Sequence, residues 1–295
     1  MSVDGGAVSP EWPDPELGSS RRPALSWVGW IGVGAISACA LIAIVGPWLA
    51  PHDPIQTLSN ESFAFPPEAA FLGTDYLGRD LLSRLLHGAR LTLLLSLATA
   101  IIAFVLGVAA GFAAAIAGRW LDLLLSRIVD GLLAVPSIIL ALMVIGSLGT
   151  SVPVLIGTVA VIEGGRIFRV ARALARDLDV MDFMEAARAR GEGMLWLMLR
   201  EMLPNAIGPL VTEFGLRLTY TLLFISALSF LGFGMQPPSA DWGAMVKENI
   251  EGLLYGSPAA LLPAACIAVA TIGVNLLIDG YLDRATIDRV PDMLP

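Results

Sequence analysis

The sequence predicts an all-α integral membrane protein with six transmembrane helices. Hydrophobic residues make up 56% of the 295 residues and charged residues only 15%, and the mean hydropathy is +0.75. A soluble globular chain of this length is far less apolar. Six apolar segments each exceed the roughly 20 residues that an α-helix needs to cross a bilayer. Polar stretches rich in Gly, Pro or charged residues separate these segments.

The N-terminal part of the chain contains the first predicted span. Residues 1–24 are rich in Pro, Gly, Ser and acidic residues and predict a disordered tail. Residues 25–50 are too long for a signal peptide and lack a small-residue cleavage site, so they predict the first transmembrane helix. Residues 51–88 predict an extracytoplasmic loop with a short helix on the membrane surface.

The other five spans form a predicted core, residues 89–280. The third of the six spans contains Pro136 and is expected to bend there, since proline interrupts helical hydrogen bonding. Residues 234–257 predict a second outer loop, and residues 281–295 a polar cytoplasmic tail. The core spans are predicted at residues 89–117, 120–148, 151–173, 206–233 and 258–280.

The basic residues predict the orientation of the chain. If the N-terminus is cytoplasmic, most arginines fall on the inner side, and the outer side keeps few. Lys and Arg concentrate in the cytoplasmic loops of membrane proteins. We therefore expect both termini and the polar stretch 178–204 in the cytoplasm. The basic residues left on the outer side are Arg79, Arg84, Arg90 and Lys247.

The sequence contains no motif for catalysis. Walker-type GxxxxGK[ST], HExxH, CxxC and GxSxG motifs are all missing from it. Cys39 and Cys266 stand in separate apolar runs and predict buried, inert thiols, and His52 and His87 lack a second ligand at metal-binding spacing. We expect a chain that is not an enzyme and binds no metal or cofactor. Its net charge of −8 argues against nucleic acid as a partner.

Charged residues inside the predicted spans are costly in a bilayer and are candidates for function. Arg217 lies about twelve residues into the fifth span, on the order of 18 Å deep, and Glu213 stands one turn earlier. Either the two form a self-contained pair, or Arg217 lines a translocation path and attracts a carboxylate or phosphate of the substrate. Glu163 and Arg166 flank two glycines in the fourth span. Close packing or a kink at the glycines is one interpretation, and a gate or substrate contact is the other.

Further residues of opposite charge stand three or four positions apart. Such pairs are neighbours on a helix surface. The expected pairs are Asp75–Arg79 and Asp80–Arg84 in the first outer loop, and Arg127–Asp130 in the third span.

The stretch 178–204 is the most distinctive part of the sequence. Asp182 and Glu185 have the spacing of a capping box that begins a helix. Gly191 offers the left-handed position that ends one, and an amphipathic run leads from there to Pro204. A short helix held between two spans gives a cytoplasmic partner a surface by which to move both.

The same stretch resembles a known family. Its pattern is similar to the EAA coupling loop of permease subunits in binding-protein-dependent ABC importers. The residues that carry it are Glu185, Ala186, Ala187, Gly191, Leu203, Pro204 and Asn205. LGTDYLGRDLLSR at 72–84 and LSFLGFGMQPPSADWG at 228–243 resemble the dipeptide, oligopeptide and nickel class of these permeases. The resemblance extends over residues 51–284.

Three positions depart from the pattern of the family. Its members usually carry His in place of Glu201, Leu in place of Arg190, and a small residue in place of Arg217. The first two departures bear on how the loop meets its partner, and the third bears on the substrate.

The resemblance implies an ABC importer permease in the cytoplasmic, or inner, membrane of a bacterium or archaeon. It implies partners: a homologous permease that completes the pore, two subunits that bind ATP and magnesium, and an extracytoplasmic solute-binding protein for which both outer loops are candidate docking surfaces. The implied cargo is a peptide or a related small solute.

The alternative is an ion-coupled secondary carrier that works without an ATPase, for which Glu163, Glu213 and Asp130 are the available carboxylates.

Overall fold

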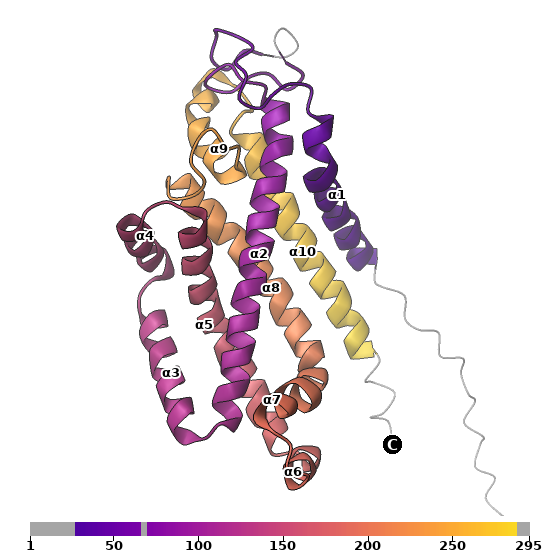
Figure 1. The fold of residues 1–295 in the computed structure, drawn as a ribbon. Helices are drawn as coiled ribbons and strands as arrows, with labels where there is room; N and C mark the ends of the chain where they lie inside the picture. The colour runs from indigo at the N-terminus through magenta and orange to yellow at the C-terminus, as the bar shows by residue number, and fades with distance from the viewer. Residues whose placement is uncertain (1–26, 66–69, 288–295) are drawn as a thin grey trace, which may run out of the picture.

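The computed structural model describes residues 27–65 and 70–287 as a bundle of helices (Figure 1). The predicted all-α architecture is confirmed for these residues. The helices are α1 (Trp27–Leu49), α2 (Leu81–Ile116), α3 (Arg119–Ala134), α4 (Ser137–Leu148), α5 (Val152–Asp179), α6 (Asp182–Ala189), α7 (Met194–Trp196), α8 (Leu203–Phe230), α9 (Trp242–Glu248) and α10 (Leu261–Ile287). A π-helical segment, Leu197–Met202, joins α7 to α8, and a 3-10 helix, Ile250–Tyr255, follows α9.

Four helical runs within the described residues are long and apolar enough to cross a membrane. They are α1, α2, the run Met194–Phe230, and Leu261–Leu282 of α10. The pair α3 and α4 makes a fifth if it counts as one span, and it is bent by 92° at the predicted break beside Pro136. The 28 residues of α5 are sufficient in length, but this helix carries Glu163 and several arginines and falls short in apolar character.

The second span begins earlier than the sequence predicts. Helix α2 starts at Leu81 rather than at residue 89, because the Asp80 carboxylate accepts hydrogen bonds from the free N–H groups of Leu82 and Ser83. The short helix expected within residues 51–88 is therefore not a separate element, since residues 81–88 form the first two turns of α2. The described part of residues 51–80 forms turns and two isolated β-bridges instead.

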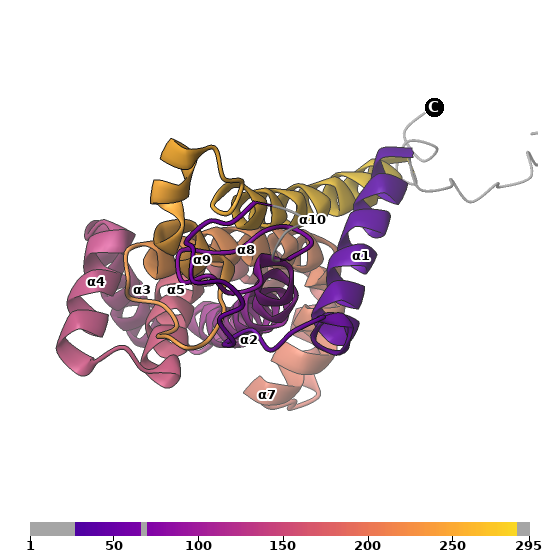
Figure 2. The ribbon, with the colours of Figure 1, turned by 90° about the horizontal axis from the view of Figure 1, so that it is seen from above.

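Helix α2 lies in the middle of the bundle, between α1 and α10 on one side and α3 and α4 on the other (Figure 2). Small residues allow it to approach α5 closely. A Cβ atom added at Gly107 would lie 2.7 Å from the carbonyl oxygen of Gly164, and one at Gly111 would lie 2.8 Å from the Cβ of Ala171. Such close backbone contact stabilises helix pairs in membranes, where lipid removes the hydrophobic drive for association.

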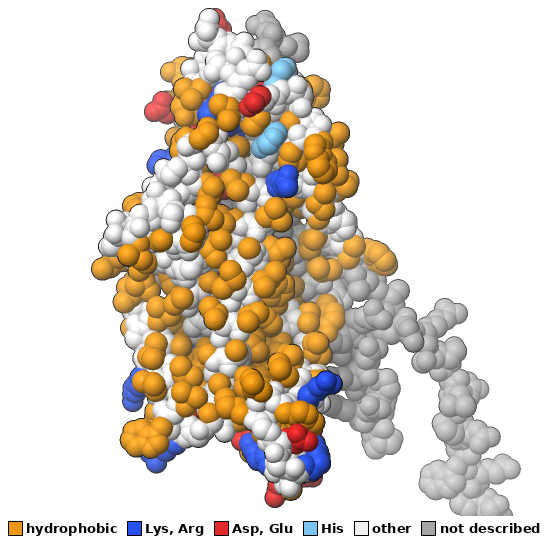
Figure 3. All heavy atoms as spheres, viewed as in Figure 1, with side chains coloured by type: hydrophobic (Ala, Val, Ile, Leu, Met, Phe, Trp, Pro, Cys, Tyr) orange, Lys and Arg blue, Asp and Glu red, His pale blue; other side chains and the backbone are white. Residues whose placement is uncertain are grey.

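The distribution of side chains on the surface matches a protein surrounded by lipid. Apolar side chains cover the middle of the molecule, and charged side chains gather towards its two ends (Figure 3). Leu41, Ile44, Val105 and Leu106 are large apolar residues that are more than half exposed. Exposure on this scale would be unfavourable in water, and a bilayer removes that cost.

Candidate functional site

Helix α6 lies at one end of the molecule, beyond α5 and α8 (Figure 1). Met184 and Ala187 are completely buried on its inner face, in the apolar cluster that also includes residues of α2, α5 and the π-helical segment. Leu203 packs against the same cluster. Glu185 and Ala186 are exposed on the outer face. The helix is thus fixed by one face and accessible on the other.

The sequence predicted the end of α6 correctly but not its start. The capping box is wrong, because Asp182 is already helical, and Met181, whose side chain makes no cap hydrogen bond, precedes it. Asp182 and Glu185 instead place negative charge in the first turn, where the helix dipole favours it. The end is as predicted: Gly191 has a φ of +81°. Its N–H donates to the carbonyl oxygen of Arg188 at 2.9 Å, as in a Schellman motif.

The chain after Gly191 folds back along α6. Arg190 donates to the carboxylate of Glu201 at 3.2 Å, and its guanidinium lies 5.5 Å from the centre of the Trp196 ring. The two departures from the family pattern in this loop therefore pair with each other. Pro204 occupies the first turn of α8, and the Asn205 amide donates to the carbonyl oxygen of Glu201 at 2.7 Å.

The structure brings the four charged candidates of the spans together in one cluster. Arg217 and Glu213 do form an ion pair, with Nε of Arg217 2.7 Å from the Glu213 carboxylate, but the pair is not self-contained. Arg217 also lies 3.4 Å from the carboxylate of Glu163, which in turn binds Arg166. Arg166 donates to the hydroxyl of Ser137 at 2.6 Å. These contacts link α5, α8 and the first residue of α4.

A cavity of about 470 Å³ opens beside this cluster. Its lining includes Pro136, Ser137, Glu163, Arg166 and Tyr220. The side chain of Arg166 is 34% exposed and that of Glu163 only 1%. An anionic group in this cavity would meet the Arg166 guanidinium. The side chain of Arg217 is 16% exposed and is held between two carboxylates.

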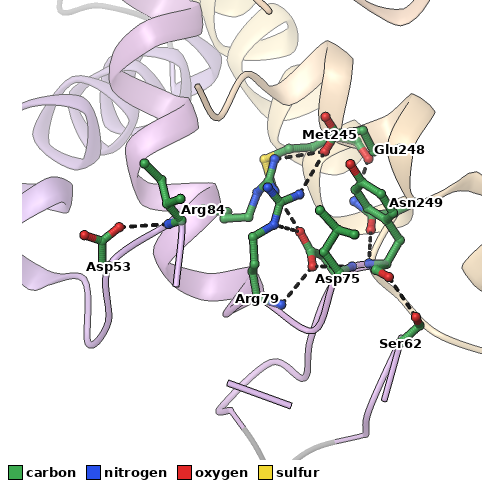
Figure 4. A network of polar contacts seen from close by, with 11 residues as sticks. Asp53, Ser62, Asp75, Arg79, Arg84, Met245, Glu248 and Asn249 are labelled. Carbon is green, nitrogen blue, oxygen red and sulfur yellow. Dashed lines mark hydrogen bonds and ion pairs between the residues drawn. The ribbon is translucent and has the colours of Figure 1, made fainter. Parts of the chain in front are cut away.

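A second ionic network joins the two predicted outer loops (Figure 4). The Asp75 carboxylate accepts hydrogen bonds from Arg79 and Arg84, each at 2.7 Å. Glu248 of α9 accepts one from Arg84 at 2.9 Å and one from Arg79 at 3.5 Å. Asp75 and Arg84 are almost completely inaccessible. Burial raises the pKa of Glu248, and the Arg79 charge opposes that rise.

Two predicted pairs are wrong, and long-range contacts replace them. Asp80 does not pair with Arg84; it caps α2, and Arg84 reaches Glu248, 164 positions away. Asp130 binds Arg169 of α5 at 2.9 Å rather than Arg127. Nothing in the local sequence around residues 72–84 points to Glu248, and sequence reasoning missed it.

Cys39 and Cys266 are free thiols and are half-buried. Both pack against the apolar cluster that contains Trp242 and Met245 of α9. The two histidines contribute to local hydrogen bonding: His52 lies 3.3 Å from the Asp80 carboxylate, and His87 lies 2.9 Å from the carbonyl oxygen of Ser83.

Comparison with known proteins connects this geometry to a family. The family described as binding-protein-dependent transport system inner membrane component matches residues 103–286. A di/tripeptide transport system permease of Pseudomonas aeruginosa is 36% identical over 251 residues, which cover 83% of this chain and 82% of that protein. A glutathione transport system permease of Pectobacterium atrosepticum is 30% identical over 243 residues, with 82% and 81% covered. A dipeptide transport system permease of Alkalihalophilus pseudofirmus is 31% identical over 253 residues, with 86% and 83% covered.

Proposed function

This chain belongs to the binding-protein-dependent transport system inner membrane components, as a permease of the dipeptide and oligopeptide class of ABC importers, and we propose that it imports peptides or a related small solute. It is a multi-pass protein of the bacterial inner membrane. In ABC importers of this family, ATP is hydrolysed by subunits separate from the permease. In the proposed assembly it forms half of a pore with a homologous permease. Two ATP-binding subunits and an extracytoplasmic solute-binding protein complete the importer.

The proposed topology has six crossings and cytoplasmic termini. Helix α5 is the sixth crossing in this topology, although its charged residues make it less apolar than the other spans. Charges inside a span are tolerated when they face the bundle and pair with one another, and Glu163, Arg166 and Arg217 do so. The arginines in the second half of α5 lie towards α6, so the excess of basic residues on the inner side supports a cytoplasmic position for α6.

Helix α6 is proposed as the contact with an ATP-binding subunit. The observation that carries the proposal is that Met184 and Ala187 of α6 pack in one apolar cluster with the start of the helical run that carries Arg217. The chain after α6 runs as unbroken helix from Met194 to Phe230. Arg217 stands on the same rod, about 21 Å from Leu203 at 1.5 Å per residue. A push on α6 would therefore reach the Glu163 contact through the packing of Met184 and Ala187 on the start of this run, and the turn at Gly191 need not transmit it.

The transport cycle follows from this connection. Closure of the ATP-binding subunits moves α6, and α8 moves with it as a packed element with two discrete positions. The Arg217–Glu163 contact would then change, and with it the hold of Arg166 on Ser137 at the α3–α4 break. A peptide carboxylate would bind Arg166, whose planar guanidinium matches an oxyanion at two points.

The experiment uses the whole importer in proteoliposomes, with ATP hydrolysis and dipeptide uptake measured together. Glu185→Lys should abolish the stimulation of ATP hydrolysis by loaded binding protein, and uptake with it. Arg166→Ala and Arg217→Ala should lower uptake and leave the ATP-binding subunits attached. If ATP hydrolysis and uptake stayed normally coupled in Glu185→Lys, α6 would be only a linker and the proposal would be wrong.

A second arm of the experiment addresses the ion-coupled carrier. This chain is reconstituted without ATP-binding subunits, and a proton or sodium gradient is imposed. If the chain is an ABC permease, we expect no uptake in that case. Uptake driven by the gradient would replace the proposal with a carrier that uses the carboxylates of Glu163 and Glu213.

A further inference from the structure

A second cavity lies between α3 and the second half of α5. Its volume is about 380 Å³, and it is separate from the cavity beside Glu163. Three of its lining residues are arginines and one is an aspartate. The lining residues are Leu123, Ser126, Arg127, Asp130, Phe168, Arg169 and Arg172.

The ion pairs around this cavity leave an excess of positive charge. Asp130 binds Arg169 at 2.9 Å. Asp122 binds both Arg172, at 2.8 Å through Nη2, and Arg176. Arg127 is exposed and makes no hydrogen bond or ion pair with any residue whose contacts the structure describes. Four arginines thus face two carboxylates, and the free cation stands at the cavity itself.

A buried hydroxyl lines the same cavity. The Ser126 oxygen is inaccessible and has no hydrogen-bond partner in the part of the chain that is described. A buried hydroxyl without a partner is unfavourable, because it has lost water and gained nothing in return. A rotation of the Ser126 side chain that brought this oxygen to the cavity surface would let an anionic oxygen there accept its hydrogen.

The outer face of α3 next to the cavity is apolar. Trp120 is 87% exposed, and Leu124 and Ile128 are each 58% exposed. Figure 3 shows basic and large apolar side chains side by side at the lower left of the molecule, where Figure 1 draws the first turns of α3. Tryptophan favours the boundary between lipid and water. The cation and the buried hydroxyl therefore lie where a lipid headgroup meets its acyl chains.

We propose that the cavity between α3 and α5 binds the headgroup of an anionic phospholipid. Arg127 contacts the phosphate, since a guanidinium donates two parallel hydrogen bonds to it. Ser126 donates a further hydrogen bond, and the acyl chains lie along Leu124 and Ile128. Basic residues at a membrane surface attract anionic lipids in this way. The binding does not depend on the transport function proposed above.

The test is native mass spectrometry of the purified importer titrated with phosphatidylglycerol or phosphatidylcholine. The expected result is preferential retention of phosphatidylglycerol that falls about fivefold in Arg127→Gln, the effect of losing one basic residue near an anionic surface. Arg90→Gln is the matched control. Arg90 is also exposed and makes no ion pair among the described residues, and it lies on α2 at the side of the molecule away from α6.

Two further variants and a competitor complete the test. Arg127→Lys keeps the charge and should show an intermediate loss, and Ser126→Ala should weaken retention without altering assembly. Equal retention in Arg127→Gln and the unaltered protein would overturn the proposal. Complete displacement of the lipid by inorganic phosphate would identify a free phosphate site instead. Loss of the second permease from Arg127→Gln, with lipid retention unchanged, would identify a protein interface.

Discussion

Replacing Arg84 with methionine should cost the protein about 3–5 kcal/mol of folding free energy, as expected when one partner of a buried ionic network is removed. The Arg84 side chain is 1% exposed and binds both Asp75 and Glu248. Methionine fills most of the same volume, so lost packing contributes little. After the change, Glu248 keeps only the 3.5 Å contact with Arg79. The cost arises because desolvated carboxylates lose their compensating charge.

The assay is thermal unfolding of the purified protein, followed by tryptophan fluorescence. A loss of this size lowers the midpoint by on the order of 10 °C in a chain of this length. Arg90→Met, on the same helix and exposed, should change stability by less than about 0.5 kcal/mol. Glu248→Gln alone should also destabilise, and the double variant should lose less than the sum of the two single changes. Additive losses, or an Arg84→Met protein as stable as the Arg90→Met control, would refute the network as the bond between the outer loops.

Three further changes test other parts of the molecule. Gly191→Val should cost about 1–2 kcal/mol, because its left-handed backbone suits no β-branched residue, and limited proteolysis should cut the α6 region faster; unchanged cleavage would count against the turn. Gly107→Val should cost about 1–3 kcal/mol through overpacking, since the added Cβ meets the Gly164 carbonyl; an unchanged midpoint would mean that α2 and α5 separate freely. Arg190→Ala and Glu201→Ala should each cost less than about 1 kcal/mol, because the Arg190 side chain is 51% exposed; a larger loss on thermal unfolding would assign that pair a structural role.

Local rules predicted the features that depend on local sequence. The break beside Pro136, the left-handed backbone of Gly191 and the Glu213–Arg217 pair follow from a single residue or from spacing within one helical turn. The long apolar runs likewise predicted most of the helices, because a bilayer demands a minimum helix length.

Features that depend on tertiary contact could not be predicted in this way. Glu163 and Arg217 stand 54 positions apart, and Arg84 and Glu248 stand 164 apart. No spacing rule connects residues at such separations. The start of α2 was predicted too late for a related reason: Arg84 was expected on a short surface helix outside the span, yet Asp75 and Glu248 satisfy its charge and allow α2 to continue through it.

The π-helical segment Leu197–Met202 sets the rotational phase of everything that follows it. With about 4.4 residues per turn, each of its residues rotates the chain by about 80° instead of about 100°. A step of four residues therefore falls about 30° short of a full turn in this segment and goes about 40° beyond one in α8. Met198, Met202, Ala206 and Leu210 are spaced by four and all stay buried, because the two drifts partly cancel. If the remaining five residues kept these wide turns, deleting one residue from the segment would rotate Arg217 by about 80° about the helix axis relative to Glu163. The segment therefore sets the direction in which Arg217 points relative to the α6 end of the chain.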